Sequence, residues 1–271
     1  MQRIRGLISF LICVTILCSA YAADIPYIHW PTMVQKGMQL FNQGRYDEAE
    51  AVLKEALEVV EKNRPDHPNV AVSLNYLSQV YRAQGRLAEA EEAARRALEI
   101  QGRSLERNHP EVSASLNNLA EVYRAQGKHV DSASLARQAL ELQEKPWGGE
   151  SPQAAASLNI LATSALAMGR LKEAEELAQQ AIHLNEKLFG ANRVESASST
   201  VTLAEVYQAQ GRLSQAESAY KRALLLQELS LGGDHPEIAS TLEKLAGLYE
   251  KTRRTGDAEQ LRARAKRIRG K

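Results

Sequence analysis

The sequence of 271 residues contains only two cysteines, Cys13 and Cys18, and both lie close to its N-terminus. The remainder can therefore form no disulfide, carry no thiol nucleophile and supply no cysteine ligand to a metal. A chain without free thiols suits an oxidising compartment, where unpaired thiols would mispair.

Neither sign of charge is in excess: 34 basic residues face 33 acidic ones, for a formal net charge of +1. A near-neutral chain has no long-range field that gathers phosphate groups. We therefore expect no nucleic-acid partner.

Motifs that carry catalysis are also missing, since no H-E-x-x-H, G-x-S-x-G or phosphate-binding glycine loop occurs. Carboxylate pairs such as Glu89 with Glu91 and Glu173 with Glu175 recur along the chain. Recurrence is typical of solvated helix faces and not of a unique acid–base pair in a pocket. We predict no catalytic residue, no metal site and no cofactor.

The one long apolar run is Leu7–Cys18, which follows two arginines and precedes the small-x-small tripeptide Ala20-Tyr21-Ala22. This order is typical of a secretory signal peptide over 1–22, cleaved between Ala22 and Ala23. A bilayer span needs about 20 residues, so an uncleaved membrane anchor is the less favoured alternative. Cleavage would remove two arginines and no acid, leaving a net charge of −1. We expect a secreted or periplasmic protein.

A repeat organises the rest of the chain. Turn glycines stand at 44, 85, 127, 169 and 211, spaced by 41 and then three times by 42 residues. A His-Pro or Ser-Pro pair keeps the same register at 67–68, 109–110, 151–152 and 235–236, and only Arg193-Val194 breaks it. Periods of this length predict stacked structural repeats.

Each unit has the apolar spacing of two helices. In the second unit Leu74, Leu77 and Tyr81 follow helical steps, and small residues such as Ala90 and Ala97 follow the glycine. Proline favours the first turn of a helix and glycine the position after its end. Small residues seven apart let the two helices approach closely. Each unit is therefore predicted to be a helical hairpin.

The units resemble the tetratricopeptide repeat, with large residues at positions 4, 7 and 11, a small one at 8, glycine at 15 and alanine at 20 and 27. The longer period, with strings such as SLNNLAEVYRAQG and RALEI, resembles the kinesin light chain type. This resemblance implies an all-α, right-handed solenoid of about six hairpins with a concave inner surface. After a linker over 23–32, the solenoid would cover 33–271, with hairpins at about 33–63, 68–105, 110–146, 152–189, 194–231 and 236–271.

Three histidines, His67, His109 and His235, share one repeat position. Successive repeats lie about 10 Å apart, a helix-packing distance, which is too far for shared ligation of one metal. We interpret the histidines as part of the turn that starts the next helix.

A polar stripe on the first helices is the candidate binding site, because the resemblance places these positions in the concave groove. Its asparagines could pair with a peptide backbone, since an amide both donates and accepts. The alternative is that they stack neighbouring helices. The predicted peptide-binding residues are Asn75, Gln79, Arg82, Asn117, Glu121, Arg124, Asn159 and Thr163.

The sequence thus predicts a non-catalytic scaffold that holds a protein or peptide segment in its groove, with the two arginines favouring a partly acidic one. The alternative is a structural protein of the cell envelope that self-associates or acts through its convex face and end caps. The basic C-terminal run, 262–271, is interpreted as a polar cap, with weak binding to lipid headgroups as the alternative. The partner's identity and the oligomeric state stay open.

Overall fold

A computed structural model describes residues 29–106, 109–147, 149–191 and 193–270. The predicted signal peptide and most of the predicted linker lie outside these residues. The described chain is helical between its turns and contains no strand. Residues 29–42 form the first helix, and the helices that follow are α2 (Tyr46–Asn63), α3 (Pro68–Ala83), α4 (Leu87–Ser104), α5 (Pro110–Ala125), α6 (His129–Trp147), α7 (Pro152–Ala167), α8 (Leu171–Phe189), α9 (Ala197–Ala209), α10 (Leu213–Leu231), α11 (Pro236–Lys251) and α12 (Thr255–Arg269).

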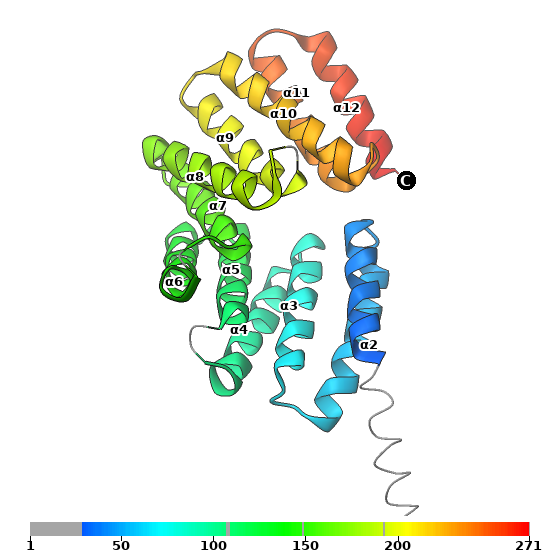
Figure 1. Ribbon diagram of the computed structural model, residues 1–271. Helices are drawn as coiled ribbons and strands as arrows, with labels where there is room; N and C mark the ends of the chain where they lie inside the picture. The colour runs from blue at the N-terminus through cyan, green and yellow to red at the C-terminus, as the bar shows by residue number, and fades with distance from the viewer. Residues whose placement is uncertain (1–28, 107–108, 148, 192, 271) are drawn as a thin grey trace, which may run out of the picture.

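The helices pack in chain order as six antiparallel hairpins, and this confirms the all-α solenoid (Figure 1). Within a hairpin the fully buried alanines, such as Ala90 and Ala97, bring the two helices together. The first helices also contact each other, α3 with α5, α5 with α7 and α7 with α9. They form the inner layer, and the second helices form the outer one.

The shared histidines begin helices. Nδ1 of His109 accepts a hydrogen bond from the backbone N–H of Glu111 at 3.3 Å, and His67 and His235 cap α3 and α11 in the same way. Ser151 does this for α7 with its hydroxyl. The fifth hairpin has no such pair, and a short 3₁₀ helix, Val194–Ser196, precedes α9. The prediction that these residues start helices is confirmed.

Two local features differ from what the sequence suggests. The proline and glycines of Lys145–Gly149 predict an irregular loop, yet α6 continues to Trp147. The last turn has Arg253 where the others have glycine, but its backbone still adopts the left-handed φ of +60°. The hydrogen bonds on both sides of Arg253 hold it in the conformation that glycine adopts elsewhere.

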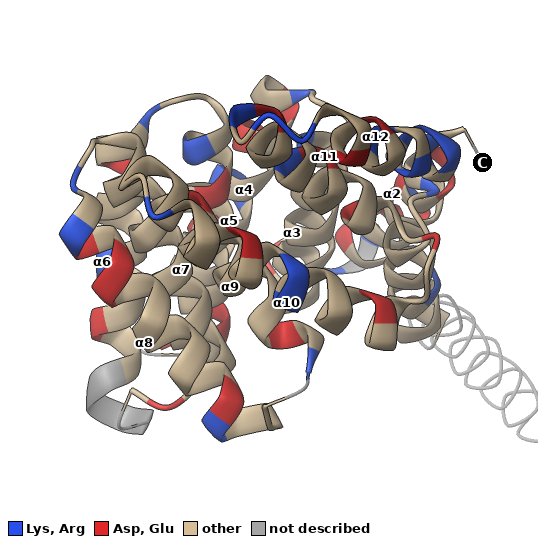
Figure 2. Ribbon diagram, turned by 90° about the horizontal axis from the view of Figure 1, so that it is seen from above, with Lys and Arg blue, Asp and Glu red and all other residues tan. Residues whose placement is uncertain are grey.

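The C-terminal basic run is tied back onto the solenoid. Arg262 pairs with Glu250, Arg264 with Glu228, and Arg269 with Glu243. Figure 2 shows basic residues gathered on α12, while both signs of charge mix over the other helices. These ion pairs agree with the interpretation of this helix as a polar cap.

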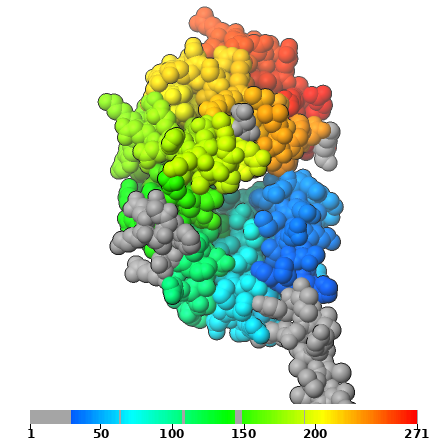
Figure 3. Space-filling model, viewed as in Figure 1, coloured from blue at the N-terminus to red at the C-terminus, as the bar shows by residue number. Residues whose placement is uncertain are grey.

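The solenoid also curls far enough for its ends to meet. The turn after the first helix lies against the start of α11 (Figure 3), where the ring of His235 contacts the carbonyl oxygen of Asn42. The first helices of the hairpins therefore surround a common central space.

Candidate functional site

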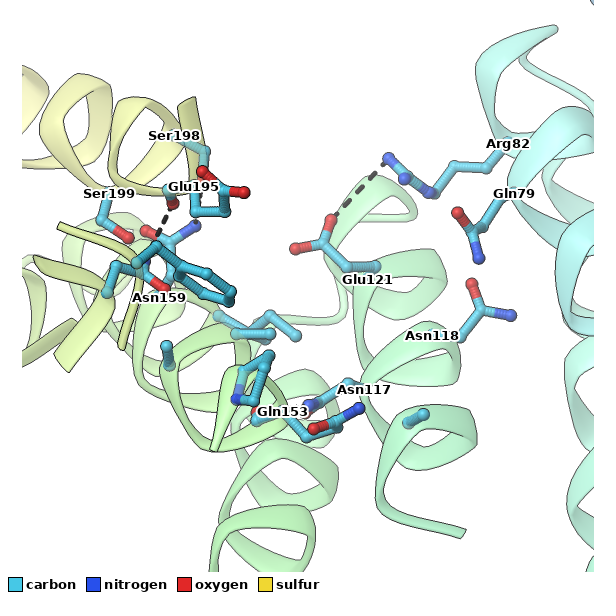
Figure 4. A pocket seen from close by; sticks show the side chains of 17 residues that line it. Gln79, Arg82, Asn117, Asn118, Glu121, Gln153, Asn159, Glu195, Ser198 and Ser199 are labelled. Atoms are coloured by element: carbon cyan, nitrogen blue, oxygen red, sulfur yellow. Dashed lines mark hydrogen bonds and ion pairs between the residues drawn. The ribbon is translucent and has the colours of Figure 1, made fainter. Parts of the chain in front are cut away.

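A cavity with a volume of about 460 Å³ lies on the inner side of α3, α5, α7 and α9 (Figure 4). Its polar lining comes from the inner faces of successive hairpins. The polar residues are Gln79, Arg82, Asn117, Asn118, Glu121, Gln153, Asn159, Asn185, Glu195, Ser198 and Ser199. Ile160 and Phe189 add an apolar part, so this groove can accept both hydrogen-bonding and apolar groups of a partner.

A second cavity of about 420 Å³ continues the groove toward α11. Arg82, Glu121 and Asn159 line both cavities, while Arg124 and Thr163 line only the second. Of the eight predicted site residues, seven therefore line the groove. Asn75 lines neither cavity.

Charges of both signs line the groove, and within its second cavity they balance. The second cavity is lined by three basic residues, Arg82, Arg124 and Lys244, and by three acidic ones, Glu121, Glu205 and Glu237. These six charged residues leave the cavity with no net charge. A partner of mixed charge fits this surface better than an acidic one.

Glu121 partly neutralises the two predicted arginines. Its carboxylate lies 2.7 Å from Nη2 of Arg124 and 3.7 Å from Nη1 of Arg82. Burial lowers the pKa of Arg124, but the charge and hydrogen bond of Glu121, together with the charge of Glu205, outweigh this effect and raise the pKa. Nε of Arg82 is buried without a hydrogen-bond partner among the described residues. Arg82 thus keeps one unsatisfied donor beside the groove.

The three asparagines join neighbouring repeats. Nδ2 of Asn117 donates to the carbonyl oxygen of Gln153 at 2.9 Å, and its Oδ1 accepts from the hydroxyl of Ser157 at 2.8 Å. Only 6% of Asn117 is exposed. Asn75 bonds to Ser115 and Asn118, and Asn159 to Ser198 and Thr202. This is the stacking role that the sequence left as the alternative to groove contact.

Sequence reasoning missed a row of small residues. Ala114, Ala156, Ser198 and Ser240 occupy one repeat position, three residues before the asparagine position, and all line the groove. Small side chains at this position leave room for a partner. Their spacing of 42 residues was visible in the sequence, but it does not reveal which helix face lines the groove.

The described residues hold no group of three or more His, Cys, Asp or Glu side chains arranged to bind a metal ion. Within the same part of the chain, no helix is both long and apolar enough to cross a membrane.

Four segments, 31–103, 83–145, 153–224 and 195–271, match the tetratricopeptide repeat family. Together they cover most of the chain. The chain belongs to the tetratricopeptide repeat family. Repeats of this family generally mediate protein–protein interaction, and the present protein is a scaffold built from such repeats.

Solved structures of kinesin light chain-like repeats are similar to this tetratricopeptide protein. A kinesin light chain protein of Podosopora anserina with nearly identical TPR-like repeats is 27% identical, with a TM-score of 0.57 over 75% of this chain and 96% of that one. BtubC (BKLC) of P. vanneervenii is 22% identical, with a TM-score of 0.61 over 84% and 91%. PilF of Pseudomonas aeruginosa is 18% identical, with a TM-score of 0.53 over 90% and 93%. The last two likenesses show the fold alone. No protein of curated function matches this chain.

Proposed function

We propose that this tetratricopeptide protein is a secreted or periplasmic scaffold that holds an extended polypeptide segment in its concave groove and performs no chemistry on it. The observation that carries this proposal is the pair of adjoining cavities on the inner helix layer, about 460 and 420 Å³ in volume. An extended chain presents backbone donors and acceptors along its length, and the amide and hydroxyl groups of the groove can satisfy both.

The side chains proposed to contact the partner are those that line the groove. Gln79 and Thr163 offer neutral polar groups, while Arg82, Glu121 and Arg124 offer charges of both signs. The asparagines would act indirectly, because their bonds between repeats hold the inner helices at a fixed spacing. Location in the envelope is supported by the signal-like segment 1–22.

Filling the groove tests the proposal without breaking any bond between repeats. Ala156 is exposed on α7 and lines the larger cavity, so Ala156→Arg places bulk in the groove. Ala88 is exposed on α4 and lines neither cavity, so Ala88→Arg is the matched control. The protein would be expressed with its own N-terminal segment, immobilised and exposed to envelope extract, and retained proteins would be identified by mass spectrometry.

A partner retained by the parent protein and by Ala88→Arg, but lost with Ala156→Arg, supports groove binding. If Ala156→Arg retains the same proteins, the groove is not the site.

A second candidate function is self-association or envelope assembly through the outer face. Leu225 and Leu229 of α10 are 53% and 67% exposed. At the position of Leu229 the other hairpins have Lys62, Arg103, Lys145 and Lys187. An exposed apolar pair that interrupts a charged repeat position favours contact with another protein surface.

The double change Leu225→Glu with Leu229→Lys restores residue types found in other repeats. If the outer face self-associates, this variant should sediment as a monomer under conditions where the parent protein forms dimers. A parent protein that is monomeric at all concentrations excludes self-association.

A further inference from the structure

Two segments separated by about five repeats meet at one point of the molecule. The turn after the first helix presents Asn42 and Gly44, and the start of α11 presents His235 and Pro236 (Figures 1 and 3). We name these four residues the closing contact. It brings the first and last hairpins of the solenoid together.

The histidine at this contact has a defined hydrogen-bonding state. Its Nδ1 accepts from the backbone N–H of Glu237 at 3.3 Å, so the proton of the neutral ring is on Nε2. Nε2–H then donates to the carbonyl oxygen of Asn42. His109 caps its own helix identically, but α5 begins the third hairpin, in the middle of the solenoid. The capping residue of the last hairpin therefore also contacts the first hairpin.

The glycine at this contact is also in a special environment. A Cβ on Gly44 would lie 2.5 Å from Cγ of Pro236, whereas one on Gly85, Gly127, Gly169 or Gly211 would meet nothing within 4 Å. All five glycines have φ between +74° and +78°. The backbone conformation is therefore the same, and only Gly44 lacks space for a side chain because of α11.

The pKa of Tyr46, two residues after Gly44, also reflects the proximity of the first and last hairpins. Burial raises the pKa of the Tyr46 phenol, the carboxylate of Glu237 raises it further, and Arg82 opposes both effects. Tyr46 begins α2, Arg82 lies at the end of α3, and Glu237 lies in the first turn of α11. The groove thus has residues of the second and last hairpins near the same tyrosine.

We propose that the closing contact joins the ends of the solenoid into a ring, which the chain end of an extended polypeptide can enter and a folded surface cannot. The contact joins the turn after the first helix to the start of α11, whereas α2 packs extensively on α3 and not on α11. It can therefore open without unfolding any hairpin. The ring is a property of the fold alone, whereas its role in selecting partners rests on the proposed function.

Disulfide trapping tests the ring directly. A Cβ at residue 44 would lie 3.6 Å from Cβ of Pro236, within the range of about 3.5–4.5 Å that disulfides need. In a full-length chain with Cys13→Ser and Cys18→Ser, Gly44→Cys and Pro236→Cys should form an intramolecular disulfide in dilute solution. Gly127→Cys with Pro236→Cys has the same glycine strain and should not. A test pair that stays reduced like this control overturns the ring.

A matched pair of glycine substitutions covers the case in which the double variant does not fold. Gly44→Ala and Gly85→Ala impose the same backbone strain, but only the former clashes with Pro236. With spin labels at the exposed residues Gln43 and Glu259, electron–electron distance measurements should show a longer separation for Gly44→Ala alone. Equal distances in both variants and the parent would mean that the contact does not hold the ends together.

Partner selection is tested with phage-displayed random peptides on the oxidised, ring-locked protein. Peptides displayed at a free terminus should enrich, and peptides held inside a disulfide-closed loop should not. Equal enrichment of both would overturn selection by the ring while leaving groove binding in place. If neither library enriches even on the reduced protein, the proposed function fails, and the trapping result still decides whether the ring exists.

Discussion

Single residues in the turns join each hairpin to the one before it. Nε2 of Gln126 donates to Glu91 of the preceding hairpin at 2.8 Å, and Gln210 bonds to Glu175 in the same way. The arginine after the glycine adds a second contact, since Arg212 also reaches Glu175. The recurring Ala-Gln-Gly-Arg string is therefore a connection between repeats as well as a turn.

The turn at Met168 lacks this bond between glutamine and glutamate. The third hairpin has Ala133 where the others have this glutamate, and the following turn has Met168 in place of glutamine. Met168 instead packs against the apolar cluster that contains Ala133. When the acceptor is missing, the donor is replaced by an apolar side chain, so no buried amide is left without a partner.

These glutamates make stability depend on pH. Hydrogen bonding from Gln126, opposed by burial and reinforced by Arg95 and Lys128, lowers the pKa of Glu91 from 4.5 to about 2. A depressed pKa contributes stability that is present above pH 4.5 and lost as the pH falls toward about 2. Glu91→Gln should lower the free energy of unfolding by about 1 kcal/mol at neutral pH and by almost nothing near pH 2. Urea unfolding at several pH values across this range measures the difference. Equal losses at both ends would show that the charge is not responsible.

Arg253 offers a stabilising change. Its φ of +60° is unfavourable for a residue with a side chain, at roughly 1–2 kcal/mol. Arg253→Gly should therefore raise the free energy of unfolding by about 0.5–1 kcal/mol after the larger chain entropy of glycine is subtracted. Thermal unfolding beside the parent protein measures this. An unchanged or lower midpoint would mean that Arg253 makes a compensating contact.

At the scale of the helix, the polar stripe of α3, α5 and α7 has two tasks that the sequence does not separate. Asn117 faces the next repeat, and Glu121, four residues later, faces the groove with Arg82 and Arg124. Residues four apart lie on the same side of a helix, so a helical pattern assigns them together. The curvature of the stack turns one toward a neighbour and leaves the other open.

Asn117→Ala should therefore act on stability before it acts on binding. It removes the two hydrogen bonds that Asn117 makes to the next repeat, while the hydroxyl of Ser157 still donates to the carbonyl oxygen of Gln153 at 3.0 Å. The expected loss is about 0.5–1.5 kcal/mol for each hydrogen bond removed. Gln79→Ala removes a half-buried side chain with no such bridge and is the matched comparison. Urea unfolding should give a lower midpoint for Asn117→Ala only. Equal midpoints would show that Asn117 does not stabilise the stack and is available to contact a partner in the groove.

At the scale of the whole molecule, the N-terminal segment would determine the compartment in which the protein acts. If residues 1–22 form a signal peptide, protein purified from an envelope fraction should have the mass of residues 23–271, by intact mass spectrometry. The variant Ala22→Arg should block processing, because the cleavage site requires small residues. A parent protein of full-length mass in that fraction would favour the membrane anchor.

The sequence by itself determined the repeat, the hairpins, most helix starts and ends, and the family. Each of these depends on spacing within about 40 residues, where helical periodicity and the chemistry of proline and glycine act locally. It also placed seven of the eight predicted residues on the groove, because they share one helix face in successive repeats.

Only the tertiary structure decided which polar residues join repeats, that charges of both signs meet in the groove, and that Asn42 and His235 meet. The last contact spans 193 residues and has no local pattern. It results from a small rotation between hairpins that accumulates along the stack until the first and last hairpins touch.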